Sequence, residues 1–137
     1  MNEMEAIRIT LEQISNTAMQ LNNDTIKVIV DRPISQGGGG NGLMGGQYLL
    51  TGIGGCFCST FFAAAQSRSF EIEGFQVDVI ATKSEDLPKR FTDIRLDVSY
   101  KKCSDPVIFK KLLKIAEMGC ISINTIKEGM GFKVHQK

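Results

Sequence analysis

The sequence predicts an α+β fold, and three observations carry this prediction. The segment from Gln47 to Ser67 is apolar and uncharged over about twenty residues, which is too long for a strand and fits a helix. Two further segments, Gly74–Lys83 and Arg90–Lys101, alternate apolar and polar side chains as half-buried strands do. The expected strands do not alternate regularly with the expected helices, which argues against a doubly wound parallel sheet.

Length and composition exclude several classes of protein. The chain has 137 residues, so we expect one domain over 1–137, and its 42% hydrophobic content excludes a disordered tail. A net charge of +1 argues against a nucleic-acid partner. The single histidine, His135, argues against a Ser-His-Asp triad and against a multi-histidine metal site, so no metal is expected.

Cysteine usage and the start of the chain indicate a reducing compartment. Four cysteines are too few for a small disulfide scaffold. Glu3 and Glu5 interrupt any apolar leader, and no uninterrupted apolar run reaches the ~18 residues of a membrane span. We therefore expect a cytoplasmic protein with reduced thiols and no membrane partner.

The N-terminal segment, 1–24, predicts a helix, and a short strand is expected directly after it. Its apolar residues recur at spacings of three and four, as on one helical face: Ile7, Leu11, Ile14, Ala18 and Leu21. Turn-forming residues end this pattern at 22–24. Thr25–Val30 is rich in β-branched residues and predicts a strand, which Pro33 stops.

The run Gly37–Gly46 predicts a loop, and two readings of it stay open. A strand precedes it and a helix follows it, so its backbone amides could form a nest for an anion. It lacks the Gly-Lys-Ser/Thr end of a phosphate loop, which favours a flexible connector. The following Gln47–Ser67 helix is apolar nearly all round and is expected at the buried centre of the domain.

The second half of the chain predicts a hairpin, a pair of helices and a last strand. Glu85–Lys89 connects the two alternating strands. Asp105 followed by Pro106 is typical of a helix start, and Gly119 interrupts that helix. Two shorter elements follow: a second helical piece over Cys120–Ile126 and a final strand over Phe132–His135.

The cysteines offer thiol chemistry or plain packing. Cys56 and Cys58 would point about 200° apart on a helix, which weakens a metal site built on that pair and leaves an inert buried thiol as the alternative. Cys120 follows a helix break, where a helix N-terminus would lower its pKa and favour the thiolate. A space-filling cysteine is the alternative there, and the residues alone do not separate the two.

Two segments resemble one known family. They are Leu-Leu-Thr-Gly-Ile-Gly-Gly-Cys, which ends at Cys56, and Ile-Ala-Glu-Met-Gly-Cys-Ile, which contains Cys120. Together they resemble the OsmC/Ohr family, the osmotically inducible and organic hydroperoxide resistance proteins. The spacing of the two cysteines, the two long strands between them and the closing strand are also similar to the family pattern. The resemblance covers about residues 25–137, after the N-terminal segment.

The resemblance implies a fold and an activity. The implied fold is an intertwined α+β homodimer with central helices wrapped by antiparallel sheet. The implied activity is a thiol-dependent, stress-related peroxidase that reduces a small apolar organic hydroperoxide, with Cys56 as the peroxidatic thiol and Cys120 as the resolving thiol. It implies no bound cofactor and an external dithiol reductant. Cys58 and Cys103 match no family position.

The chain departs from the family pattern at the residues that activate the thiol. Gly46 stands where the family has a glutamate, and no arginine aligns with the family's activating arginine. Without such a donor, a raised pKa is expected for Cys56 in an apolar helix. Arg32 is the candidate substitute, from the loop of its own chain or of a partner. The alternatives to a peroxidase are therefore a non-catalytic ligand-binding protein and a redox sensor on the same fold.

Overall fold

The computed structural model describes residues 6–23 and 25–137, which fall into two compact units. The first unit ends at Leu49 and the second begins at Leu50. Helix α1 (Gly45–Gln66) begins in the first unit and runs on into the second. The observed α1 matches the predicted helix closely, while the single domain over 1–137 stays a prediction.

The first unit contains a three-stranded antiparallel sheet in the order β1 (Leu11–Gln13), β2 (Met19–Leu21) and β3 (Ile29–Val30). The predicted N-terminal helix is therefore wrong over 6–23, and its remaining positions, 1–5 and 24, lie outside the described residues. The Ser15 hydroxyl accepts hydrogen bonds from the N–H groups two and three residues on, at 3.2 and 3.0 Å, which closes a turn. The pairing of Met19 with Val30 then fixes the register, so tertiary pairing overrides the helical spacing.

A loop organised by Asp31 follows β3. The Asp31 side chain is only 3% exposed, and its carboxylate accepts hydrogen bonds from the backbone N–H groups of Arg32, Gly39 and Asn41 at 2.8, 3.3 and 3.2 Å. Burial raises the pKa of Asp31, but these hydrogen bonds outweigh burial and the pKa lies below its ordinary value. The glycine run thus already directs amides at an internal carboxylate, which removes the support for an external anion site there.

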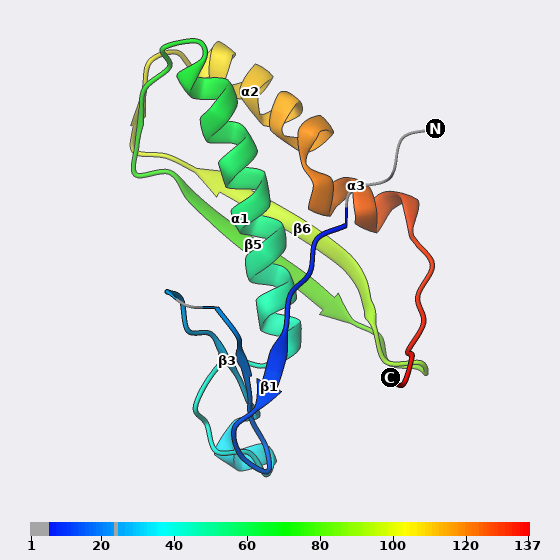
Figure 1. Cartoon of the computed structure of the whole chain (residues 1–137). Helices are drawn as coiled ribbons and strands as arrows, with labels where there is room; N and C mark the ends of the chain where they lie inside the picture. Colours follow the sequence, from blue (N-terminus) through cyan, green and yellow to red (C-terminus); the bar gives the residue numbers. More distant parts are fainter. Residues whose placement is uncertain (1–5, 24) are drawn as a thin grey trace, which may run out of the picture. The chain divides into compact units, whose positions relative to one another are not determined.

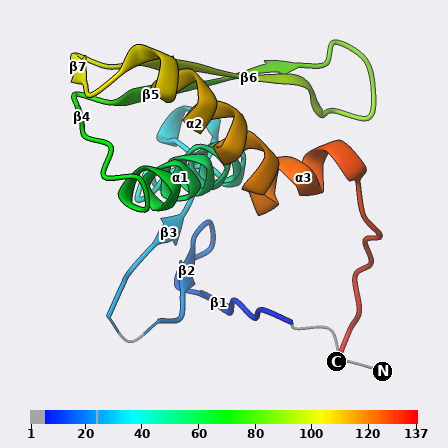
Figure 2. The same cartoon turned by 90° about the horizontal axis from the view of Figure 1, so that it is seen from above.

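The second unit places helices on one face of a β-hairpin. Strands β5 (Gln76–Lys83) and β6 (Phe91–Ser99) pair antiparallel with Val79 opposite Leu96, which confirms the predicted hairpin. Figures 1 and 2 show α1 and α2 (Pro106–Gly119) on the same side of this hairpin. Helix α3 (Ile121–Glu128) follows α2, and the short strands β4 (Ile72–Glu73) and β7 (Lys102–Cys103) form a separate pair.

Phenylalanine rings fill the core between the helices and the hairpin. Phe61 of α1 is fully buried, and its ring centroid lies 4.6 Å from that of Phe75 and 5.6 Å from that of Phe109. Leu112 of α2 is also fully buried. Each such side chain contributes roughly 1.5–3 kcal/mol by burial, so this cluster is the main stabilising feature of the second unit.

A glycine allows α1 to approach the hairpin. A Cβ atom built on Gly54 would lie 2.7 Å from Cγ2 of Val79 in β5, which is closer than packed carbon atoms come. The side of α1 that carries Gly52, Gly55 and Ser59 is exposed, so the helix is buried on one side and not all round. By length and composition alone α1 could also cross a membrane, a test that core helices of soluble proteins pass as well.

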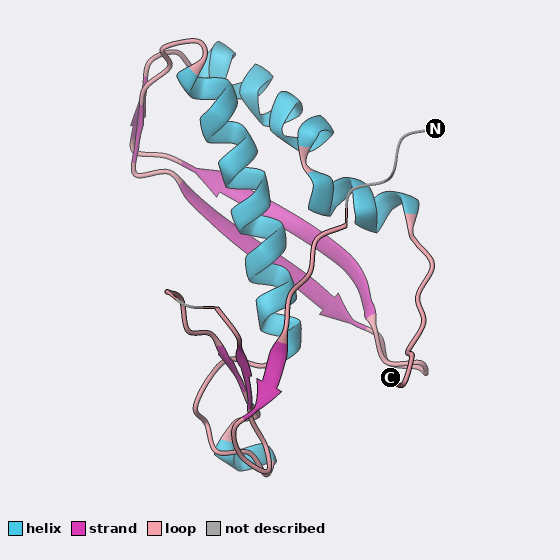
Figure 3. Ribbon diagram, viewed as in Figure 1, coloured by secondary structure: helices cyan, strands magenta, loops and turns pink. Residues whose placement is uncertain are grey.

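The last elements confirm one prediction and correct another. Asp105 caps α2, since its carboxylate accepts the N–H of Val107 at 2.8 Å with Pro106 at the first helical position, as predicted. The predicted strand Phe132–His135 is wrong, because no described strand pairs with it and the chain after α3 is loop (Figure 3). A strand needs a neighbour to satisfy its backbone groups, and this segment has none within the described chain.

Candidate active site

Cys56 and Cys120 come from different helices and meet in the second unit. Cys56 lies on α1, one residue before the buried Phe57, and is half-buried. Cys120 stands between α2 and α3 and is fully buried. The two side chains are hydrogen-bonded to each other, which is the juxtaposition expected of the candidate pair.

The helix break at Cys120 brings this thiol to α1. Cys120 has an extended backbone, φ −81° and ψ 112°, so it ends α2 and begins α3. Gly119 beside it permits a close approach, since an added Cβ would lie 3.2 Å from Cγ2 of Thr60, one turn past Cys56. The ion pair between Lys127 and Glu117, at 2.6 Å, joins α3 back to α2 across the break.

The first turn of α3 directs hydrogen-bond donors at the sulfur of Cys56. The Ser122 hydroxyl and the Ser122 backbone N–H are the two largest influences that lower the pKa of Cys56. Burial opposes them, while the Cys120 thiol and the Ile121 N–H lower the pKa further. The first N–H groups of a helix have no partner inside the helix and carry its positive dipole end, so they stabilise a thiolate.

The pKa of the second thiol, Cys120, is shifted in the opposite direction. Burial raises the pKa of Cys120, and the adjacent Cys56 raises it further, although the N–H of Ile123 acts against this. Cys56 is therefore the more acidic thiol of the pair and Cys120 the less acidic one. A more acidic thiol beside a less acidic one suits the attacking and resolving roles of a thiol–disulfide cycle.

Two expectations drawn from the sequence are reversed here. The pKa of Cys56 was expected above its ordinary value, but the donors of α3 place it below. The helix N-terminus was expected to lower the pKa of Cys120, but burial outweighs it there. Ser122 was missed by sequence reasoning, and the only signal for it is its place directly after the helix break.

Arg32 belongs to the first unit, in the loop after β3. Its backbone N–H binds Asp31 and its carbonyl accepts the N–H of Gly40 at 3.0 Å, so its position follows from the glycine loop. Within residues 6–23 and 25–137 no hydrogen bond or ion pair holds its guanidinium. Its role towards Cys56 stays a prediction.

Cys58 and Cys103, the two cysteines outside the pair, have surroundings that differ from those of Cys56. Burial raises the pKa of Cys58, which has no lowering partner. Cys103 in β7 is hydrogen-bonded to Tyr100, whose pKa is raised by that contact. No group of three or more metal-ligating side chains occurs in the described part of the chain.

Comparison with known proteins gives a family and a fold. The sequence model of the OsmC-like protein family matches residues 38–135. A hypothetical protein from Aquifex aeolicus VF5 superposes with a TM-score of 0.77 at 16% identity, covering 91% of this chain and 89% of that one. An OsmC-like protein from Mycoplasma pneumoniae gives a TM-score of 0.76 at 18% identity, covering 90% and 88%.

A neighbour with a more specific description is also similar. An organic hydroperoxide resistance protein, OsmC, from Legionella pneumophila gives a TM-score of 0.67 at 16% identity, covering 92% of each chain. No curated protein sequence matches this chain. At these identities the likeness shows the α+β fold of the neighbours, while the family follows from the match over most of the chain.

Proposed function

The chain belongs to the OsmC-like protein family, and from that premise we propose that it reduces organic hydroperoxides through a Cys56–Cys120 thiol–disulfide cycle. The observation that carries this proposal is the asymmetry of the two thiols. The donors at the start of α3 lower the pKa of Cys56, while burial and the neighbouring thiol raise the pKa of Cys120. A hydroperoxide resistance protein among the structural neighbours supports the substrate class.

The proposed cycle has three balanced steps. The Cys56 thiolate attacks the terminal oxygen of ROOH, the O–O bond breaks, and the departing alkoxide takes a proton to give ROH, which leaves a sulfenic acid on Cys56. Cys120 then loses its proton and attacks that sulfur, so the S–S bond forms and hydroxide leaves as water. An external dithiol reduces the disulfide and is itself oxidised.

In this proposal, the main groups that activate the Cys56 thiol are hydrogen-bond donors of α3. Gly46 at the exposed start of α1 supplies no carboxylate, and the Ser122 hydroxyl with the first amides of α3 takes the place of the family's usual groups. Hydrogen bonds to a charged group are stronger than those to a neutral one, so these donors shift the ionisation of Cys56 towards the thiolate. Arg32 remains a second proposed donor, from its own loop or from a partner copy.

A homodimer completes the proposal. The outward face of α1 carries small and apolar residues at helical spacing, namely Gly52, Gly55, Ser59 and Phe62, and all four are exposed. The C-terminal segment exposes alternating apolar side chains, with Met130, Phe132 and Val134 between 77% and 89% accessible. A second copy that covers both features would remove apolar surface from water.

Peroxide titration with mass mapping tests the cycle. We expect one equivalent of cumene hydroperoxide to convert the reduced protein into a Cys56–Cys120 disulfide, which dithiothreitol then reverses. Cys120→Ser should stop at the Cys56 sulfenic acid, whereas the matched control Cys103→Ser should behave as the parent protein. Thiols that remain reduced at excess peroxide would refute the proposal.

The absence of the family glutamate favours one second candidate, a redox sensor. Gly46 supplies no carboxylate that could assist turnover, so oxidation without rapid recycling is the alternative. Steady-state consumption of hydroperoxide with a dithiol present separates the two. A sensor forms one disulfide per chain and then stops, whereas a peroxidase consumes many equivalents.

A further inference from the structure

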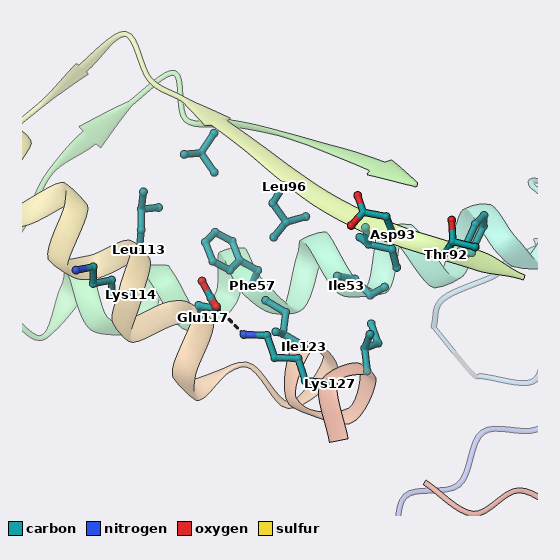
Figure 4. Close-up of a pocket in the computed structure, with 14 residues that line it drawn as sticks. Ile53, Phe57, Thr92, Asp93, Leu96, Leu113, Lys114, Glu117, Ile123 and Lys127 are labelled. Atoms are coloured by element: carbon teal, nitrogen blue, oxygen red, sulfur yellow. Dashed lines mark hydrogen bonds and ion pairs between the residues drawn. The ribbon is translucent and has the colours of Figure 1, made fainter. Parts of the chain in front are cut away.

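The second unit also contains an apolar hollow. It has a volume of about 530 Å³ and lies between β6 and the inner sides of the three helices (Figure 4). Neither Cys56 nor Cys120 lines it. Its walls are mostly aliphatic and aromatic, and the main apolar contributors are Ile53, Phe57, Leu96, Val98, Leu113 and Ile123.

The polar groups of the hollow are few and sit at its edge. Glu117 and Lys127 neutralise each other through their ion pair. Figure 4 shows Lys114 and Asp93 towards opposite ends of the hollow. Lys114 is exposed, and no described residue forms an ion pair with it, so one end of an apolar space carries an available cation.

The charge at the Lys114 end is reinforced by neighbours on α2. Lys114 also lines a smaller surface hollow together with Lys110 and Lys111, beside Pro106 and Val107. Lys114 therefore borders both hollows, and two further lysines line the smaller one. A ligand that fits both features has an apolar chain and an anionic head, because the head gains charge-assisted hydrogen bonds at the lysines.

We propose that this hollow binds a single-chain amphiphile with a carboxylate head, such as a medium-chain fatty acid. The alkyl chain lies against Phe57, Leu96 and Ile123, and the carboxylate faces Lys114. The volume falls within the ~300–1,000 Å³ of ordinary small-molecule sites, and such sites combine apolar walls with a few placed polar groups. The proposal does not depend on peroxidase activity, since the thiols lie outside the hollow.

Binding of dodecanoate to the reduced protein by calorimetry, below its micelle concentration, tests this site. We expect affinity to rise by up to about fourfold per methylene from octanoate to dodecanoate, as burial of CH₂ groups predicts. Dodecyltrimethylammonium has the same chain with a cationic head and should bind at least tenfold more weakly. Equal binding of the two amphiphiles would overturn the proposal, because it would indicate apolar adsorption only.

Variants and methyl NMR locate the bound chain. Lys114→Glu should weaken dodecanoate binding at least tenfold, Lys114→Arg should retain it, and the matched charge reversal Lys27→Glu, outside both hollows, should change it less than twofold. Methyl signals of Leu96 and Ile123 should shift on binding. Binding that survives Lys114→Glu unchanged, shifts confined to other methyls, or no binding at all would each refute the site.

Discussion

Substitution of Gly54 by alanine tests the close approach of α1 to the hairpin. A Cβ at this position would lie 2.7 Å from Cγ2 of Val79, and Val79 is a stiff β-branched residue in the middle of β5. Overpacking of this kind destabilises by roughly 1–3 kcal/mol. Alanine in place of glycine inside a helix returns roughly 0.5–1 kcal/mol, so the expected net loss of unfolding free energy is about 1–2 kcal/mol.

Urea denaturation of the reduced protein at fixed protein concentration measures this effect. With a slope of about 2 kcal/mol per molar urea, the midpoint should fall by roughly 0.5–1 M while the slope stays unchanged. Gly45→Ala provides the comparison, because a Cβ there meets no atom within 4 Å. Its expected change is within about 0.5 kcal/mol of zero.

A double-mutant cycle identifies Val79 as the cause. In a Val79→Ala background the clashing methyl is absent, so Gly54→Ala should become neutral or stabilising by up to about 1 kcal/mol. The coupling free energy between the two positions should then be about 2 kcal/mol. If Gly54→Ala lowers stability equally in both backgrounds, the contact with Val79 is not the reason for glycine at this position.

Three further predictions follow from individual side chains. Ser122→Ala should raise the pKa of Cys56 and move the pH profile of its alkylation by iodoacetamide to higher pH, whereas Ser122→Thr should leave that profile unchanged. If the pH profile of Ser122→Ala equals that of the parent protein, the Ser122 hydroxyl does not lower the pKa of Cys56. Because the pKa of Asp31 is lowered in the folded protein, its ionised carboxylate stabilises the fold above pH 3.8, and this stabilisation is lost as the pH falls below that value. The loss of unfolding free energy caused by Asp31→Asn, measured by urea denaturation, should therefore be present at pH 7 and smaller at pH 3. Phe61→Ala should lower the unfolding free energy by roughly 3–5 kcal/mol, while Met118→Ala, at an 80% exposed position, should change it by less than about 0.5 kcal/mol.

The elements that the sequence predicts well are those whose signals are local. Alternation of side chains over Gly74–Lys83 and Arg90–Lys101 was enough for β5 and β6. The cap Asp105 with Pro106 placed the start of α2, and the break at Gly119 separated α2 from α3. Each of these signals depends on neighbours in the chain, so no tertiary information is needed.

The failures occur where distant segments decide the outcome. Apolar spacing over Ile7–Leu21 suits one face of a helix, yet β1 pairs with β2 as a hairpin, and β2 pairs further with the more distant β3. The segment Phe132–His135 has the alternation of a strand but no partner strand in the described chain. Local periodicity cannot report whether a neighbour is available.

The sequence selects the two thiols of the candidate site but does not indicate the donors that surround them. Cys56 and Cys120 could be selected from their settings and their resemblance to a family pattern. The role of Ser122 could not, because it arises from the packing of the start of α3 against α1. The sequence therefore suggested a thiol without an activating group, whereas the fold supplies one from a third helix.

The helix break at Cys120 makes α3 sensitive to the oxidation state of the protein. In the reduced form the first turn of α3 stabilises the Cys56 thiolate when that thiol ionises. A disulfide removes that negative charge, so the Ile121 and Ser122 donors lose their strongest acceptor and the first turn becomes easier to open. Oxidation should therefore accelerate hydrogen exchange at these two amides relative to those in the middle of α1, and equal protection in both forms would contradict this. In the oxidised protein the first turn of α3 would then open more easily, which would give a reductant access to the Cys56–Cys120 disulfide.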